Sequence, residues 1–97
     1  MSYKVKIRSS VRRRIVAWNL PDTVFVEVLI RLEQQLGQNP AAHLVRARHP
    51  FEGMNYGFSL VDPTNRLREF AFFFHITYGQ DEQTLEVINC AYHVTGL

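Results

Sequence analysis

Histidine is the side chain in this sequence best suited to acid–base chemistry. The chain of 97 residues carries four histidines, and an imidazole titrates close to neutrality, as proton transfer at physiological pH requires. His75 lies within a segment with the alternating pattern of a strand, and His93 directly follows another. The imidazole of either could act as an acid or a base. The alternatives are a hydrogen-bonded histidine beside Phe73 for His75 and an ordinary surface histidine for His93.

Several other kinds of chemistry are excluded by missing motifs. The sequence has no Gly-rich phosphate loop, no His-Glu-x-x-His helix and no cysteine pair that could bind zinc. Cys90 and His93 could form a nucleophilic pair, but strand alternation places them on opposite faces, so Cys90 is interpreted as a small core residue. A single cysteine also excludes an internal disulfide. We therefore expect no cofactor and no metal.

Basic residues are concentrated in the first half of the chain. Residues 1–50 hold nine Lys and Arg against three Asp and Glu, whereas residues 51–97 hold two against six, for a formal net charge of +2. This asymmetry suggests a basic surface that could meet a polyanion or an acidic partner protein. Lys4, Lys6, Arg46 and Arg48 are the candidate RNA-binding residues, since cations that track phosphates bind without regard to base sequence. A solvated sheet edge that resists aggregation is the alternative.

The elements that must position these residues begin with a strand and two helices. Residues 3–8 alternate apolar and basic side chains, which predicts a strand with one buried face. A short helix should follow from a cap at Ser9 or Ser10 to about Trp18. A second helix is expected from a cap at Asp22 to Leu36, ended by Gly37. Its core stripe comprises Phe25, Val28, Leu29, Leu32 and Leu36.

The second half of the sequence predicts a loop and then three strands. Residues 38–54 contain Pro40, Pro50 and Gly53 and are predicted as a loop. Alternation over residues 56–61, 69–77 and 85–92, with turns at 62–65 and 79–82, predicts an antiparallel meander. The predicted fold class is therefore α+β, in the order β-α-α-β-β-β, with a helical hairpin packed on a small antiparallel sheet. We expect one domain over residues 1–97, intracellular, with no signal peptide and no membrane span.

This order and several local segments resemble the RelE/ParE superfamily of bacterial type II toxin–antitoxin toxins. The resemblance covers nearly the whole chain and depends on the order and spacing of its parts. Those parts are Tyr3-Lys4-Val5-Lys6-Ile7, Leu36-Gly37-Gln38-Asn39-Pro40, Glu52-Gly53-Met54, Tyr56-Gly57-Phe58-Ser59-Leu60 and Ile88-Asn89-Cys90-Ala91-Tyr92-His93.

The resemblance implies a cytoplasmic toxin with a cognate antitoxin as its partner. The leading hypothesis is the RelE-like branch, in which the toxin is an endoribonuclease that cleaves mRNA in the ribosome. The ParE-like branch instead inhibits DNA gyrase without nuclease residues, and a degenerate protein-binding module is a further alternative. The sequence does not indicate an oligomeric state, and fold alone does not choose among these functions.

For the nuclease function, the resemblance implies a site on the sheet face away from the helices. His93 matches the position of a histidine in several nuclease members and would be the acid or base, with Tyr92 and Arg68 as further catalytic candidates. Tyr92 could equally pack in the core. The chain departs from the family at Gly57 and Ser59, where nuclease members often have lysines. Arg68 is one residue out of phase with the expected face and reaches it only through a bulge or at the start of the strand.

Overall fold

The computed structural model describes residues 2–96, so residues 1 and 97 of the predicted domain lie outside the described part. Its first half contains a short strand and a series of helices: β1 (Lys4–Ile7), α1 (Ser9–Ala17), α2 (Asp22–Ile30), the π-helical segment η1 (Arg31–Gln35), α3 (Leu36–Gln38) and α4 (Pro40–His43). Its second half contains the strands β2 (Val45–Ala47), β3 (Gly53–Asp62), β4 (Asn65–Tyr78) and β5 (Thr84–Gly96).

The strands form a mixed sheet in the order β1-β5-β4-β3-β2. The strands β2 to β5 pair antiparallel, and the predicted meander is confirmed. β1 instead joins β5 in parallel, with Lys4 opposite Thr84 and Ile7 opposite Val87. The α+β fold class is confirmed, but the sheet is not wholly antiparallel. The alternation of residues 3–8 specifies a half-buried strand and leaves its neighbour and direction open.

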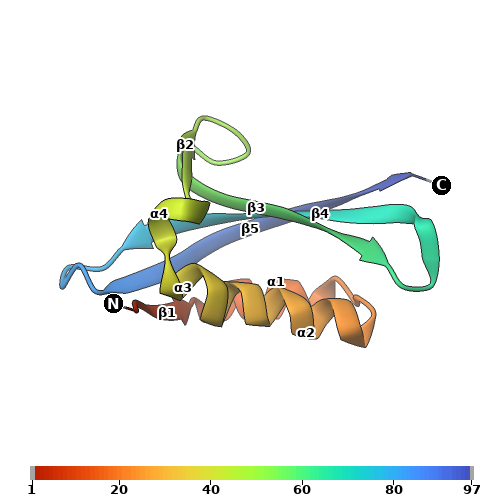
Figure 1. Cartoon of the computed structure of the whole chain (residues 1–97), viewed down its shortest axis with the longest axis horizontal. Coiled ribbons are helices and arrows are strands. Elements are labelled where there is room, and N and C mark those ends of the chain that lie inside the picture. The colour runs from red at the N-terminus through yellow and green to blue at the C-terminus, as the bar shows by residue number, and fades with distance from the viewer. Residues whose placement is uncertain (1, 97) are drawn as a thin grey trace.

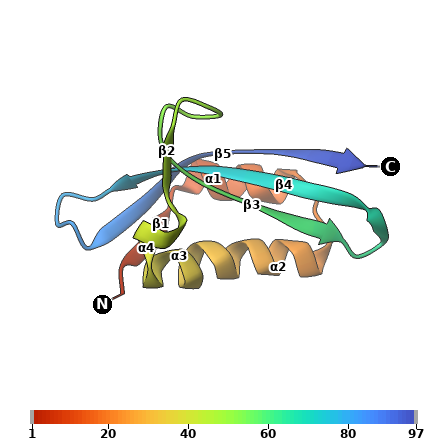
Figure 2. The ribbon, with the colours of Figure 1, turned by 45° about the horizontal axis from the view of Figure 1, so that its top comes forward.

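The helices cover one face of the sheet and leave the other face open. Figures 1 and 2 show α1 and α2 side by side beneath the long strands, while β2 rises on the opposite side. The core lies between these two layers. Its fully buried members include Val28, Leu32 and Leu36 from the helices and Phe72 and Phe74 from β4, as the helix stripe and strand alternation predict.

The second helix continues beyond its predicted end. α2, η1 and α3 follow one another without a break to Gln38, so Gly37 does not terminate the helix at Leu36. Gly37 is buried, and its carbonyl accepts a 2.7 Å hydrogen bond from the Tyr3 N–H. A Cβ at this position would lie 2.6 Å from the Tyr3 carbonyl oxygen. Glycine is needed here for the close approach of β1, not for a helix cap.

The predicted caps Ser9 and Asp22 lie inside the helices, one position after the observed N-caps. Arg8 and Pro21 occupy the N-cap positions of α1 and α2, and neither helix has a side-chain cap hydrogen bond. Asp22 is the first residue of α2, where its carboxylate still interacts favourably with the positive end of the helix dipole.

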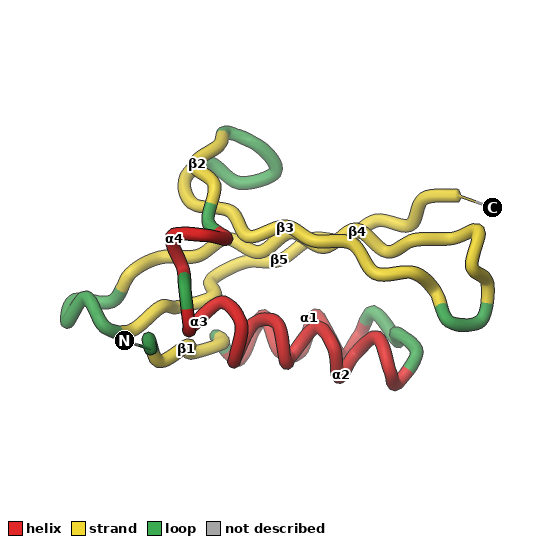
Figure 3. The backbone as a smooth tube through the Cα atoms, viewed as in Figure 1, coloured by secondary structure: helices red, strands yellow, loops and turns green. Residues whose placement is uncertain are grey.

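The segment 38–54 is not the structureless loop that its Pro and Gly content predicts. It contains α4 and the short strand β2, which pairs antiparallel with β3 from Val45 opposite Asn55 to Ala47 opposite Gly53. Figure 3 shows this strand and the following loop standing away from the sheet on the side opposite the helices. We refer to residues 45–55 as the raised hairpin. A three-residue strand between two prolines is too short for a visible alternation.

Candidate functional site

The open face of the sheet is the place where the predicted site should lie. Around His93, the neighbouring positions of that face belong to β3 and β4, where Gly57 pairs with Phe73, Ser59 with Ala71, and Ala71 with His93. Glu69 is two residues from Ala71 on the same face and is exposed. The face beside His93 therefore carries small, aromatic and acidic side chains, none of which can neutralise a phosphate.

His93 is exposed on this face and contacts an aromatic ring. Its imidazole stacks on Phe73 with ring centroids 5.8 Å apart and planes inclined by 20°. Phe73 lies on the open face, whereas Phe72 and Phe74 on either side of it are buried in the core. The stack leaves the imidazole accessible to solvent, but the aromatic ring of Phe73 can neither accept the proton that His93 would transfer nor bind a phosphate.

Tyr92 is not part of the open face. Its ring lies on the helix side of the sheet, 4.4 Å from the ring of Trp18 between centroids and 6.0 Å from that of Phe72. Strand alternation separates it from His93, its neighbour in sequence. The structure thus favours core packing for Tyr92 over a catalytic position beside His93.

Arg68 also lies on the face opposite His93. It shares the β4 face of Phe70 and Phe72, and its Nε is 3.8 Å from Oδ2 of the buried Asp62. β3 does contain a register shift, but between Val61 and Asp62, and it does not turn Arg68 to the open face. The pKa of Asp62 is lowered by hydrogen bonds from the Thr64 hydroxyl and N–H and, less strongly, by Arg68. Arg68 stabilises a turn carboxylate in this position.

The four candidate RNA-binding cations do not form one surface. Lys4 and Lys6 lie on β1 at one edge of the sheet, whereas Arg46 lies on β2 at the other edge and Arg48 directly follows it. Lys6 lines a shallow hollow that also contains Glu86. The RNA-binding roles of the four cations remain predictions. The strand order places Lys4 and Lys6 at the opposite edge of the sheet from Arg46 and Arg48.

His75 is partly covered by the raised hairpin. The Phe51 ring stacks on the imidazole with centroids 5.5 Å apart and an interplanar angle of 6°. His75 is therefore half-buried beneath the loop, in a different aromatic contact from that of His93. His75 stacks on Phe51 and His93 on Phe73, so the two histidines do not form an acid–base pair.

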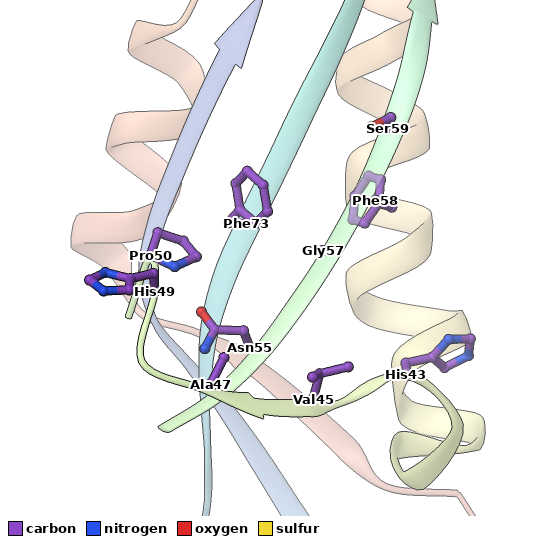
Figure 4. Close-up of a pocket in the computed structure, with 10 residues that line it drawn as sticks. All are labelled: His43, Val45, Ala47, His49, Pro50, Asn55, Gly57, Phe58, Ser59 and Phe73. Atoms are coloured by element: carbon purple, nitrogen blue, oxygen red, sulfur yellow. The ribbon is translucent and has the colours of Figure 1, made fainter. Parts of the chain in front are cut away.

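A groove between the raised hairpin and the open face was missed by the sequence reasoning. It has a volume of about 410 Å³, and Figure 4 shows the ten residues that line it. They come from α4, β2, the following bend, β3 and β4: His43, Val45, Ala47, His49, Pro50, Asn55, Gly57, Phe58, Ser59 and Phe73. Gly57 leaves room for the ring beside it, since a Cβ there would lie 3.2 Å from Phe73 Cδ1.

Asn55 is the buried polar residue of this groove. It is 6% exposed, and its Nδ2 donates to the carbonyl oxygens of Phe51 at 2.7 Å and Gly53 at 3.1 Å. Its Oδ1 is buried and accepts no hydrogen bond from any described residue. A single Asn between Met54 and Tyr56 has no signature in the sequence, because only the fold of the hairpin makes it buried.

Metal and thiol chemistry find no support in the geometry of residues 2–96. No group of three or more His, Cys, Asp or Glu side chains in that range is placed to hold a metal ion. Cys90 is fully buried, which raises the pKa of its thiol, and it lies on the core side of β5 while His93 faces out. The interpretation of Cys90 as a core residue is confirmed. No helix within the same range is long and apolar enough to cross a membrane.

Comparison with known proteins identifies a similar fold. No protein-family model and no curated protein sequence matches the chain. A chain from the crystal structure of the toxin–antitoxin complex RelBE2 of Mycobacterium tuberculosis superposes with a TM-score of 0.62 at 14% sequence identity. The match covers 96% of this chain and 93% of that one. The predicted resemblance to the RelE/ParE superfamily is confirmed at the level of the fold.

Proposed function

We propose that this chain is the toxin of a type II toxin–antitoxin pair and acts in the cytoplasm by binding its target, as ParE-like inhibitors of DNA gyrase do. The shared fold with a chain of the RelBE2 toxin–antitoxin complex supports the pairing with an antitoxin. Fold alone does not select the target, so the mechanism must be argued from the residues of the open face.

The position of Arg68 is the observation that supports target binding over RNA cleavage. RNA cleavage through the 2′-hydroxyl needs cations around the scissile phosphate, because charge develops there in the transition state. Arg68 lies near Asp62 on the opposite face from His93. Gly57, Ser59, Ala71 and Phe73 occupy the open face instead, and none of them carries a cation.

The second candidate function is a RelE-like ribosome-dependent endoribonuclease with His93 as its acid or base. It is favoured by the exposure of His93 on the open face. Tyr92 and Arg68, the other two catalytic candidates, would both have to reach this face from the helix side. The nuclease hypothesis therefore depends on His93 alone, and acid–base catalysis by one group contributes far less than a complete site.

Growth assays in cells test the toxin assignment, and assays on the purified chain distinguish the two mechanisms. Induced expression in a bacterial host should arrest growth, and coexpression of the cognate antitoxin should restore growth. The pure protein should inhibit supercoiling by DNA gyrase and should leave mRNA intact in a reconstituted translation reaction. Cleavage of mRNA in that reaction, lost in His93→Ala, would establish the nuclease instead. Expression without growth arrest would reject the toxin assignment.

A further inference from the structure

We propose that the outer edge of β5 over residues 90–96 binds an extended, acidic segment of a partner polypeptide, which adds a strand to the sheet. The proposal is independent of the proposed toxin function, because it depends only on the strand pairing and on the charges of α1. Extended segments bind exposed sheet edges in this way, with affinity from backbone hydrogen bonds and specificity from the neighbouring side chains.

The strand β5 is paired along only part of its outer edge. Its inner edge pairs with β4 from Leu85 to Gly96, whereas β1 covers the outer edge only from Thr84 to Val87. Figure 2 shows that the second half of β5 forms the border of the sheet, with α1 beneath it. Alternate residues of a strand direct their backbone N–H and C=O groups to the same edge. Residues 90–96 therefore present several of these groups without a strand partner in the described chain.

The start of this free edge is protected from pairing, and the remainder is not. The Cys90 N–H donates to Oδ1 of Asn89 at 2.9 Å, beside a register shift between β5 and β4. Residues 90–96 contain no Lys, Arg, Asp, Glu or Pro, the residues that commonly protect a sheet edge. Residues 93–96 are also exposed. The edge beyond Cys90 is thus open to an added strand.

The charges beside this edge are basic. Two of the four arginines within residues 8–14 are neutralised by ion pairs with glutamates. Arg14 instead donates to the uncharged Oδ1 of Asn89 at 2.6 Å, which places its guanidinium against β5 at the start of the free edge. Arg13, the next residue on α1, is exposed and forms no ion pair within residues 2–96. Two cations without a carboxylate partner favour an acidic segment at this edge.

The same charges disfavour a second copy of this chain as the occupant. A symmetric pairing through β5 would bring Arg13 and Arg14 close to the same two arginines of the other copy. Like charges that meet across an interface cost free energy. A nucleic acid would neutralise the arginines, but its phosphate oxygens could not donate hydrogen bonds to the carbonyl groups of the edge. An acidic polypeptide in an extended conformation satisfies the N–H groups, the carbonyl groups and both cations.

The experiment titrates the full chain, labelled with ¹⁵N, with a peptide of alternating valine and glutamate whose ends are blocked. The peptide should shift the amide signals of residues 90–96 to saturation and slow their hydrogen exchange. The same peptide with lysine in place of glutamate should bind at least about fivefold more weakly, because attraction to the two arginines becomes repulsion. Equal affinities of the two peptides, or no saturable binding by the glutamate peptide, would overturn the proposal.

Two further comparisons test the backbone pairing and the position of the site. Methylation of the backbone amides of the glutamate peptide removes its N–H donors and should abolish binding. Arg13→Glu should weaken binding about three- to tenfold. Arg48→Glu makes the same change of charge at the opposite edge of the sheet and should leave binding unchanged. Undiminished binding of the methylated peptide, or an equal loss in the two variants, would overturn the proposal.

The other occupants are tested on the same amide signals. The chain alone should show no change at residues 90–96 as its concentration rises, and single-stranded oligouridylate should bind there more weakly than the glutamate peptide. Concentration-dependent shifts of these amides would assign the edge to a second copy. Tighter binding of the oligouridylate would assign it to a nucleic acid. Either result would overturn the proposal.

Discussion

The ring of His93 stacks on the ring of Phe73 with their centroids 5.8 Å apart. This contact joins β5 to β4 on the open face, at the place where a RelE-like nuclease would need cations. The contact supports the proposed binding mechanism, because exposed aromatic side chains are enriched at protein interfaces, whereas arginine is the side chain suited to phosphate recognition.

Replacement of His93 by alanine should therefore leave growth arrest within about twofold of the wild-type level. The lost stack should lower the free energy of unfolding by only about 0.5–1 kcal/mol, since an exposed aromatic pair contributes little. Growth curves after induction and denaturant unfolding of the pure proteins measure the two effects. His93→Phe, which keeps a ring against Phe73, is the control. A loss of growth arrest in both variants would show that the imidazole itself acts.

The acid stability of the protein should depend on Asp62. Hydrogen bonds from Thr64 lower the pKa of its carboxyl in the folded state. The unfolded chain then binds the proton more readily, so this contribution to stability is present above the ordinary pKa of about 3.9 and disappears as the pH falls through the lowered folded value. Asp62→Asn should be less stable at neutral pH and should lose less stability on acidification.

Unfolding curves recorded from pH 7 down to acidic pH test this expectation. Glu52→Gln is a suitable control, because Glu52 is an exposed carboxylate in the loop of the raised hairpin. Parallel pH profiles for Asp62→Asn and the wild type would contradict the role given to this turn.

Gly37→Ala should destabilise the fold although alanine is the better helix former. The added Cβ would lie 2.6 Å from the Tyr3 carbonyl oxygen, and the Tyr3 N–H is bonded to the Gly37 carbonyl. Neither backbone can move without losing that hydrogen bond, so a cost of about 1–3 kcal/mol is expected, as for other overpacked sites. Chemical denaturation measures it. Gln38→Ala, at the exposed next position, should change stability by less than about 0.5 kcal/mol.

Phe51→Ala should loosen the raised hairpin without unfolding the sheet. The Phe51 ring holds the loop on His75 through a stack with centroids 5.5 Å apart, a contact of about 0.5–1.5 kcal/mol. Amide hydrogen exchange of residues 48, 49 and 51–53 should accelerate by up to about tenfold, while the amides of β4 and β5 keep their protection. Phe51→Tyr retains the ring and should exchange like the wild type. Unchanged exchange in the alanine variant would mean that the stack does not hold the loop.

The sequence predicted the parts of the fold that repeat a regular pattern. The alternation of residues 69–77 and the turn at Asp62 agree with the structure. The apolar stripe of the second helix agrees in part: Val28, Leu32 and Leu36 are buried as predicted, whereas Phe25 and Leu29 are only partly buried and Val24 is buried. Glu27 and Arg31 lie at i,i+4 spacing on the second helix and form an ion pair at 3.1 Å. Local chemistry determines these features, so local sequence reveals them.

The parts that the sequence did not reveal depend on contacts between distant segments. The sequence predicts a helix end at Gly37, whereas in the structure Gly37 allows the backbone of Tyr3 to approach closely. The groove around Asn55 arises because residues 45–55 fold over the sheet. Neither of these relationships has a period that one sequence could display.

The parallel pairing of β1 with β5 has a kinetic consequence. Arg8 and Glu86, which form a 2.9 Å ion pair beside this ladder, are 78 positions apart in the chain. Contacts of such long sequence separation require closing a loop that spans most of the protein before any stabilisation is gained, and folding slows as the average contact separation rises. The ladder that completes the sheet is therefore expected to form late, after the local hairpin of β3 and β4 has already assembled.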